Sequence, residues 1–306
     1  MDPTPKYLSA TPHPFSILPQ HPSLPTPSNR PSPPSFLHAL LTEAHTFLTS
    51  VPTTFHHDPK PRPSPPATAP VHLSTHTTQT RHFWACRTST HANAPIAGSA
   101  SWAEFRAGLR TNHAQHEMAY TPSVTAVDTL LSWPEQREID GGWGAVEMQV
   151  NMITHTFHPT ALISPRTFLV LAVSADRVDS DGDTQIPSFV TVQIPLVAQS
   201  ASESESDSGS DSVPVALREK IATAAPRRAV FASYASVERV VCRDRDRTGD
   251  VEWTMATTSE AGGAIPQWVQ RSWTMGGVPR AIVADVGLFI RWIAARRGVG
   301  GGPGGD

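Results

Sequence analysis

The amino-acid sequence predicts an α+β domain in which a curved antiparallel sheet packs against a long helix at the carboxyl end. Strand-like segments follow one another at short spacing through the middle of the chain, which is typical of antiparallel sheets. Residues 278–297 then carry apolar side chains at intervals of three and four, the pattern of a helix with one buried face. The 30 prolines are distributed unevenly, because residues 1–70 contain 18 of them. Proline is excluded from helix interiors and central strands, so the sheet is expected beyond residue 70.

The amino-terminal part of the chain consists of two proline-rich stretches around one helix. Residues 1–33 have no hydrophobic period and are expected to be a disordered tail. A helix is expected from Ser35 to Ser50 and should end at Val51-Pro52, because a residue before proline disfavours helical geometry. Its apolar stripe consists of Phe36, Leu37, Leu40, Leu41, Ala44, Phe47 and Leu48. Residues 51–70 are expected to form an extended link, with a ligand for an SH3-type partner as the alternative interpretation.

The body of the chain is rich in strand patterns. Strands are expected at 81–91, 123–131, 145–152, 167–174, 189–196, 229–241 and 251–257. In the first of them Trp84 and Cys86 should share one face, with Phe83 and Ala85 on the other. The clearest alternation is at 145–152, where Val146, Met148, Val150 and Met152 alternate with polar residues. A helix should open at Ser101, which forms a capping box with Glu104.

Two further segments are expected to lack regular structure. Residues 198–214 form an acidic, serine-rich loop that cannot bury apolar surface, and residues 298–306 form a glycine-rich tail. Between the last strand and the final helix, Gly276-Gly277 should break the helical pattern. The final helix places Ile282, Val286, Phe289 and Ile293 on one face.

Composition excludes several classes of protein. The formal net charge is −3 and no Lys/Arg stripe alternates with aromatic residues, so no nucleic-acid partner is expected. Two cysteines, Cys86 and Cys242, are too few for a disulfide framework or a cysteine-rich zinc module and indicate a reducing compartment. No apolar run reaches the length of a membrane span and no signal peptide is evident, so we expect a cytoplasmic protein. No phosphate-binding or dinucleotide motif follows a strand, so no cofactor is expected.

Two short motifs resemble the helix-grip fold of the START superfamily, the steroidogenic acute regulatory-related lipid-transfer domains. Pro165, Arg166 and Phe168 are similar to the opening of a START strand. The second motif, which precedes the gripping helix in START domains, is matched by Gly263, Ile265, Pro266 and Trp268. Residues 84–124 and 141–150 resemble, more narrowly, a fungal START-like family of unknown function. The chain departs from the START pattern at Ala261 and Gln270, where proline and asparagine are usual.

The resemblance implies one START-like domain over residues 34–297, with an internal cavity between the sheet and the final helix. That cavity would bind, and in some family members transfer, a lipid, a sterol or another apolar small molecule, with transient membrane contact. The predicted ligand-binding residues are Met148, Met152, Arg166, Trp253, Met255, Trp268, Ile282, Val286 and Phe289. Methionine-rich linings adapt to irregular apolar shapes, although the same residues would also fill a dry core. For Arg166, a structural ion pair and contact with a ligand headgroup are both open.

Two other functions remain as alternatives. The first is a non-enzymatic interaction protein with a filled core, which a volume below about 300 Å³ between sheet and final helix would favour. The second is an enzyme of the START superfamily that uses His155 and His158; the chain is not expected to be an enzyme. His113, His116 and Glu117 share one face of a predicted helix, but they do not form a His-Glu-x-x-His zinc motif, and no metal is expected.

Overall fold

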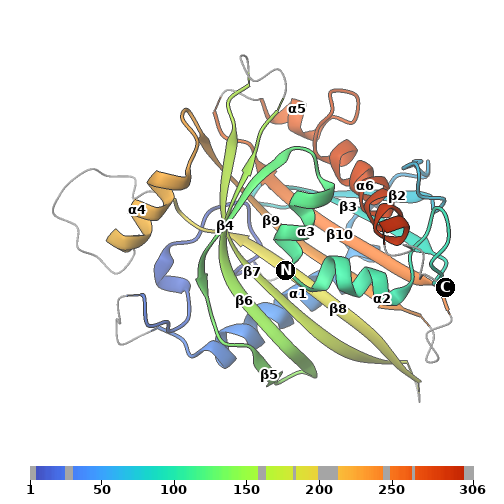
Figure 1. Ribbon diagram of the computed structural model, residues 1–306, viewed down its shortest axis with the longest axis horizontal. Coiled ribbons are helices and arrows are strands. Elements are labelled where there is room, and N and C mark those ends of the chain that lie inside the picture. Colours follow the sequence, from blue (N-terminus) through green and yellow to red (C-terminus); the bar gives the residue numbers. More distant parts are fainter. Residues whose placement is uncertain are drawn as a thin grey trace, which may run out of the picture.

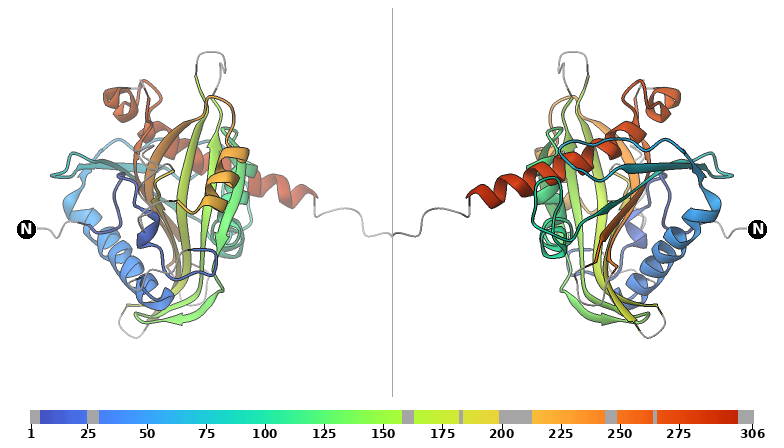
Figure 2. Two further views of the ribbon diagram at one scale, coloured as in Figure 1. Left: turned by 90° about the vertical axis from the view of Figure 1, so that its left-hand side faces the viewer. Right: turned by 90° about the vertical axis from the view of Figure 1, so that its right-hand side faces the viewer.

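The chain folds into three layers built around one curved sheet (Figure 1). The computed structural model describes residues 5–24, 30–157, 163–181, 184–198, 213–243, 249–263 and 266–299. Figure 2 shows the amino-terminal segment and α1 on one side of the sheet and α2 and α3 on the other. The α+β class, the curved antiparallel sheet and the long carboxyl-terminal helix are therefore confirmed.

The elements follow the expected order, with several additions. The helices are η1 (Phe15–Ile17), α1 (Pro33–Thr54), α2 (Trp102–Phe105), η2 (Arg106–Arg110), α3 (His113–Tyr120), α4 (Val215–Ala224), α5 (Gln267–Arg271) and α6 (Val278–Val299). The strands are β1 (His56–His57), β2 (Val71–Thr77), β3 (Phe83–His91), β4 (Val124–Ser132), β5 (Gln136–Ile139), β6 (Trp143–His155), β7 (Arg166–Asp181), β8 (Thr184–Pro195), β9 (Val230–Cys242) and β10 (Val251–Glu260). The sequence patterns did not indicate β1, β2, β5 or α4, which are short or half-exposed.

The sheet has the strand order β1-β2-β3-β10-β9-β8-β7-β6-β4, and β5 pairs with β6. Neighbouring strands along this path are antiparallel, and a short parallel pairing joins β7 to β9 at Arg166 and Val230. The central strands are long, and one register row crosses them from β3 to β8: Arg87 lies opposite Met255, Met255 opposite Glu238, and Glu238 opposite Thr191. Because paired residues face the same side of a sheet, these four side chains share one face.

The prediction that residues 1–33 are disordered does not hold for the segments that the structure describes. The apolar side chains between the prolines are buried under α1, namely Tyr7, Leu8, Phe15, Leu18 and Leu24. Arg30 is also buried and donates to the carbonyl oxygens of Phe15 and Leu18. The prolines shape an extended segment whose apolar residues are spaced closely enough to pack. Residues 1–4 and 25–29 lie outside the described residues.

The proline-rich link is likewise part of the folded body. Helix α1 continues past Pro52 to Thr54, and the backbone N–H of Phe55 bonds to the carbonyl oxygen of Val51. A proline in the last turn removes only one helical hydrogen bond, so the helix runs one turn further than predicted. Beyond it, β1 pairs with β2, and Ser64 is buried against α6. The acidic loop lies mostly outside the described residues, as does the tail after Val299.

Two apolar cores lie on opposite faces of the sheet. The first joins the amino-terminal segment and α1 to β6, β7, β8 and β9, and it includes Trp84 and Cys86. The second lies beneath α2 and α6 and includes Ala85, with Phe83 packed against it. The predicted division of strand 81–91 between two faces is therefore confirmed. Ile282, Val286, Phe289 and Ile293 are buried in the second core, as the spacing of the final helix predicts.

None of the helices in the described part of the chain is both long and apolar enough to cross a membrane.

Candidate functional site

A cavity of about 40 Å³ lies between the sheet and the helices α3 and α6. Its floor is formed by β3, β8, β9 and β10, and its roof by the two helices. By the same measure one water needs about 10–15 Å³, so the cavity has room for roughly three waters or one small polar group. Its lining is Arg87, His113, Glu117, Tyr120, Thr191, Gln193, Tyr234, Ser236, Glu238, Trp253, Met255 and Asp285. Most of these side chains are polar or charged.

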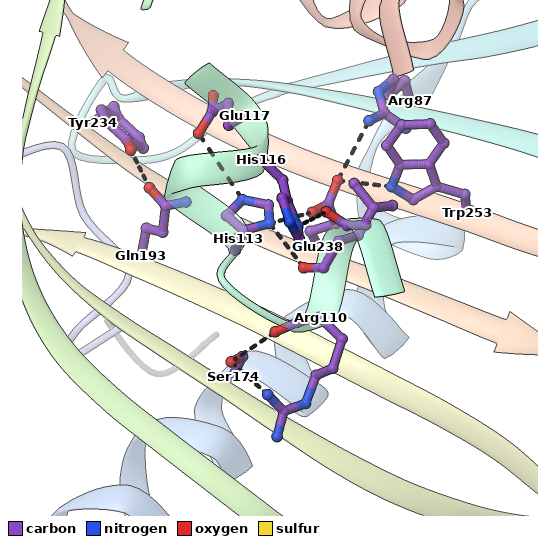
Figure 3. A network of polar contacts seen from close by, with 12 residues as sticks. Arg87, Arg110, His113, His116, Glu117, Ser174, Gln193, Tyr234, Glu238 and Trp253 are labelled. Atoms are coloured by element: carbon purple, nitrogen blue, oxygen red, sulfur yellow. Dashed lines mark hydrogen bonds and ion pairs between the residues drawn. The ribbon is translucent and has the colours of Figure 1, made fainter. Parts of the chain in front are cut away.

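Arg87 lies on the cavity floor beside Trp253 and Glu238 (Figure 3). It is 1% exposed, and its Nη2 lies 3.5 Å from Oε1 of Glu238. The guanidinium carbon lies 3.8 Å from the ring centroid of Trp253, whose indole Nε1–H donates to the same Glu238 oxygen at 2.7 Å. Burial lowers the pKa of Arg87, and the negative charge of Glu238 counteracts this effect. The aromatic face and the carboxylate together hold a cation that is otherwise removed from water.

Two of the three guanidinium nitrogens of Arg87, Nε and Nη1, are buried and have no hydrogen-bond partner among the residues that the structure describes. The hydroxyl of Thr191, in the same register row, is also buried and unpartnered. Buried donors are nearly always satisfied, because an unmade hydrogen bond costs about 1–3 kcal/mol and more for a charged group. The cavity floor therefore presents free donors to whatever occupies it.

The roof of the cavity supplies acids. On α3, Nδ1 of His113 lies 3.8 Å from Oε2 of Glu238, and its Nε2 lies 4.0 Å from Oε2 of Glu117. Burial raises the pKa of Glu117. On α6, burial raises the pKa of Asp285 to about 7, although the charge of Arg87 opposes this shift. One guanidinium and three carboxyl groups from three different elements thus line the same cavity.

The structure divides the predicted ligand-binding residues among several places. Trp253 and Met255 line the cavity. Ile282, Val286 and Phe289 lie beside it in the core under α6, where the ring of Phe289 packs on Trp253 at 5.2 Å.

Met148 and Met152 lie on the opposite face of the sheet, packed in the core beneath α1. The alternation in β6 is real, but its dry face is turned away from α6. Trp268 on α5 is 63% exposed and does not line the cavity.

Arg166 has a structural role at the start of β7. Its Nε donates to the carbonyl oxygen of Ala261 at 3.1 Å, and its Nη1 donates to that of Ser164. Its described partners are thus main-chain carbonyls, whereas the sequence left open a carboxylate or a ligand headgroup. These bonds connect β7 to the turn after β10.

Sequence reasoning missed Arg87, Glu238 and Asp285. A signal was present: Tyr234, Ser236 and Glu238 alternate with apolar residues in β9, and Thr191 and Gln193 do so in β8. Polar alternation usually marks a solvent-facing side of a strand. Here α3 and α6 cover that side, and only the fold reveals it.

The residues considered for catalysis do not meet in the cavity. His155 is half-buried, lies 3.2 Å from Ser123 Oγ through its Nδ1, and has its pKa lowered to about 4 by burial. His158 lies outside the described residues. Cys86 is buried in the core under α1, and burial raises the pKa of its thiol to about 12, which disfavours the reactive thiolate.

Comparison with known proteins gives one match by sequence family and several by fold. The chain aligns with the crystal structure of human STARD10 at 8% identity and a TM-score of 0.48, covering 91% of this chain and 86% of that one. It aligns with a STAR-related lipid transfer protein from Xanthomonas axonopodis at 12% identity and a TM-score of 0.42, covering 76% and 98%. The similarity to the crystal structure of Ara h 8.0201 is weaker, at 12% identity and a TM-score of 0.26, covering 70% of this chain and 95% of that one. These identities and TM-scores are too low to assign the activity of any of the three to this chain.

No curated protein matches the sequence of this chain. A family model described as "Protein of unknown function (DUF3074)" matches residues 84–293. This span begins in β3, ends in α6, and contains every residue that lines the cavity. Since it covers more than half of the sequence, the chain belongs to the DUF3074 family.

Proposed function

We propose that this protein binds a small amphipathic molecule of lipid type between the sheet and α6, with the polar group of the ligand in the cavity at Arg87. The observation that carries the proposal is the pair of buried guanidinium nitrogens in the cavity that have no hydrogen-bond partner among the described residues. A ligand oxygen at this point would satisfy donors that the protein leaves free. Such pockets typically place a few polar groups to orient an otherwise apolar ligand.

The apolar part of the ligand needs room that the cavity does not have. A volume of about 40 Å³ accommodates a polar group only. The adjoining surface is apolar, since Ile282, Val286 and Phe289 of α6 face the sheet there. Entry of an acyl chain or ring system therefore requires the amino-terminal half of α6 to move. The connection before α6 suits such motion, because Gly276 adopts a positive φ of 78° and has open space around it.

The proposed binding residues differ from the set that the sequence predicted. Arg87, Glu238 and Thr191 would contact the polar group of the ligand, and Trp253 and Met255 would flank it. Ile282, Val286 and Phe289 would contact the apolar part after α6 moves. Met148 and Met152 are not retained, because they face the core under α1.

Transient membrane contact is proposed at the α5–α6 connection. Trp268 and Met275 are 63% and 57% exposed there, beside Arg271 of α5. Aromatic and basic side chains at one surface suit the interface of a bilayer. An SH3-type partner of the proline-rich link remains a prediction, and it would have to bind residues 61–66 while Ser64 is engaged with α6.

A filled-core interaction protein is the second candidate. The observation in its favour is the cavity volume, which is well below the roughly 300 Å³ of a typical ligand pocket. In this case the polar cavity would contain only water.

Native mass spectrometry of the purified full-length chain, followed by solvent extraction, tests the proposal. A co-purifying lipid-type molecule, or binding to a phospholipid, sterol, fatty acid or monoacylglycerol, is the expected result. Arg87→Lys should weaken binding about tenfold or more, because the ammonium keeps the charge but loses the planar donor geometry. The matched control is Arg137→Lys, since Arg137 is exposed and does not line the cavity. If nothing co-purifies and no member of the panel binds, the interaction protein is the better description.

A further inference from the structure

The two helices that roof the cavity each place an acid in its lining. Glu117 projects from α3 and Asp285 from α6, and both line the cavity together with Arg87 of β3. Glu238 of β9 already forms the ion pair with Arg87 at 3.5 Å. One positive charge therefore faces three carboxyl groups, and only one of these is an ion-pair partner of Arg87 in the structure.

The other charged groups around Asp285 do not supply the missing positive charge. From α3 it is faced by Glu117, Tyr120 and His113, from β9 by Glu238, and from β3 by Arg87. Helix α6 also packs against α2, η2, β2, β10, α5 and the proline-rich link. None of their titratable or charged side chains lines the cavity; these are Glu104, Arg106, Arg110, His72, His76, Glu252, Glu260, Arg271, His56, His57, Asp58, Lys60 and Arg62. Arg62 is in any case paired with Asp58 at 2.6 Å.

The carboxyl-terminal half of α6 is anchored independently of the cavity. Arg297 donates to both carboxylate oxygens of Glu104, at 2.6 and 2.7 Å, and to the carbonyl oxygens of Ile96 and Ser99. Near the middle of the helix, Ser64 bonds to the backbone at Val283 and Gly287. Charge repulsion at the cavity would therefore act on α3 and on the part of α6 that precedes Gly287.

We infer that the cavity roof is a pH-sensitive latch: α3 and the amino-terminal half of α6 stay seated while Glu117 and Asp285 are protonated, and ionisation of these acids loosens both helices. Ionised, the two acids and Glu238 would leave the closed cavity with uncompensated negative charge. Opening relieves this charge by exposing the half-buried acids more fully to water. The inference rests on the proposed binding function only in that opening would admit the ligand; the latch itself needs no ligand.

The direction in which pH changes the stability of the closed state follows from proton linkage. Burial raises the pKa of Asp285 from 3.8 to about 7 and raises that of Glu117. The closed state therefore binds more protons than the open state, and its stability falls as pH rises through 7. His116 packs on Trp292 of α6 at 5.1 Å, and burial lowers its pKa below 6.5. The stability that neutral His116 provides is therefore lost as the pH falls, which is the opposite direction from the two acids. Asp285 titrates between pH 6.5 and 8.5, and the raised pKa of Glu117 acts in the same direction.

Hydrogen exchange with mass spectrometry on the ligand-free full-length protein tests the latch. Protection factors, which correct for the intrinsic effect of pH, would be compared at pH 6.5 and 8.5. In the wild type, peptides from 113–120 and 278–286 should lose protection about fourfold or more, because one acid with a pKa near 7 loses most of one proton between pH 6.5 and 8.5. Peptides from β6, which is separated from β10 by β9, β8 and β7, should change by less than about twofold.

Three variants make the experiment specific. Asp285→Asn and Glu117→Gln should each reduce the loss of protection, and the double variant should abolish it. Asp140→Asn is the matched control, because Asp140 is exposed and does not line the cavity, and it should behave like the wild type. Equal protection of α6 at both pH values in the wild type, or an unchanged loss in the double variant, overturns the latch. Either result leaves the proposed ligand binding untouched, and a failure to find a ligand leaves the latch standing.

Discussion

The hydroxyl oxygen of Ser64 accepts a hydrogen bond from the backbone N–H of Gly287 at 2.8 Å. The same hydroxyl donates to the carbonyl oxygen of Val283 at 2.6 Å, and Val283 is the residue four positions earlier in α6. Ser64 thus stands between two groups that would bond to each other in a regular helix. The proline-rich link is thereby fixed against the final helix, and Gly287 is the point at which they meet.

Gly287→Ala should destabilise the protein because no space exists for a β-carbon at this position. That carbon would lie 2.5 Å from the carbonyl oxygen of Pro65 and 2.7 Å from that of Ser64. Both neighbours are backbone atoms, so the link or the helix must shift, at a cost of about 1–3 kcal/mol. Urea unfolding monitored by circular dichroism measures the loss. Gly298→Ala is the control in the same helix: its β-carbon meets nothing within 4 Å, and alanine favours helices, so stability should be unchanged or higher.

The amino-terminal segment offers a second test, because one carboxylate holds its backbone. Glu43 of α1 accepts hydrogen bonds from the backbone N–H groups of Tyr7 and Leu8 at 2.9 and 2.8 Å, and from Lys6 at 3.1 Å. Glu43→Gln replaces one accepting oxygen by a donor and removes the charge, so residues 5–24 should detach more often. Limited proteolysis should cleave this segment several times faster than in the wild type. Glu135→Gln, at an exposed position in the loop before β5, should leave the cleavage rate unchanged.

These two regions show where sequence reasoning succeeded and where it could not. Period-two and period-three-and-four patterns located most of the strands and both long helices, because they reflect burial on one side of an element. The same patterns do not state which partner covers that side. Met148 and Met152 therefore alternate as predicted but pack under α1, while Arg87 in β3 belongs to the cavity. Likewise, Tyr7 and Leu8 are too isolated among prolines to create a period, and their burial depends on Glu43, 35 residues away from Leu8.

Removing one partner of the buried ion pair Arg87–Glu238 should cost more stability than the intact pair contributes, because the other charge is left buried and unpaired. Arg87→Met leaves the carboxylate of Glu238 buried with only Trp253 Nε1 as a strong donor, and we expect a loss of about 3–5 kcal/mol. In Arg87→Met/Glu238→Leu both charges are absent, and a large part of that loss should be recovered. A double-mutant cycle on urea unfolding free energies measures the coupling.

The exposed ion pair Arg243–Glu252 is the control for this cycle. Its atoms are closer, at 2.5 Å, but the arginine side chain is 57% exposed. Solvent screening should limit its coupling to less than about 1 kcal/mol. Equal coupling energies for the two pairs would show that burial of Arg87 has no energetic consequence.

The response to acid should depend on His91, which lies four residues from Arg87 on the same face of β3. His91 is 1% exposed, its Nε2 lies 2.9 Å from Ser89 Oγ, and its ring packs against Phe105 and Trp253. Burial, and secondarily the charge of Arg87, lowers its pKa from 6.5 to about 4. The folded state therefore binds fewer protons than the unfolded state between pH 4 and 6.5. The stability that neutral His91 provides is complete above pH 6.5 and is lost as pH falls through this window, with a slope of at most about 1.4 kcal/mol per pH unit.

His91→Gln keeps a polar group beside Ser89 but removes the titration. The slope of the unfolding free energy against pH between 6.5 and 4.5 should therefore decrease by up to about 1.4 kcal/mol per pH unit, which corresponds to one proton. Because the substitution also changes packing against Phe105 and Trp253, the slope and not the absolute stability is the quantity to compare. His72→Gln, at an exposed position of β2, is the control and should retain the wild-type slope. If the His91 and His72 variants show the same slope, the proton linkage belongs to other groups. The candidates are then His155, whose pKa burial lowers to about 4, and His116, whose pKa burial also lowers.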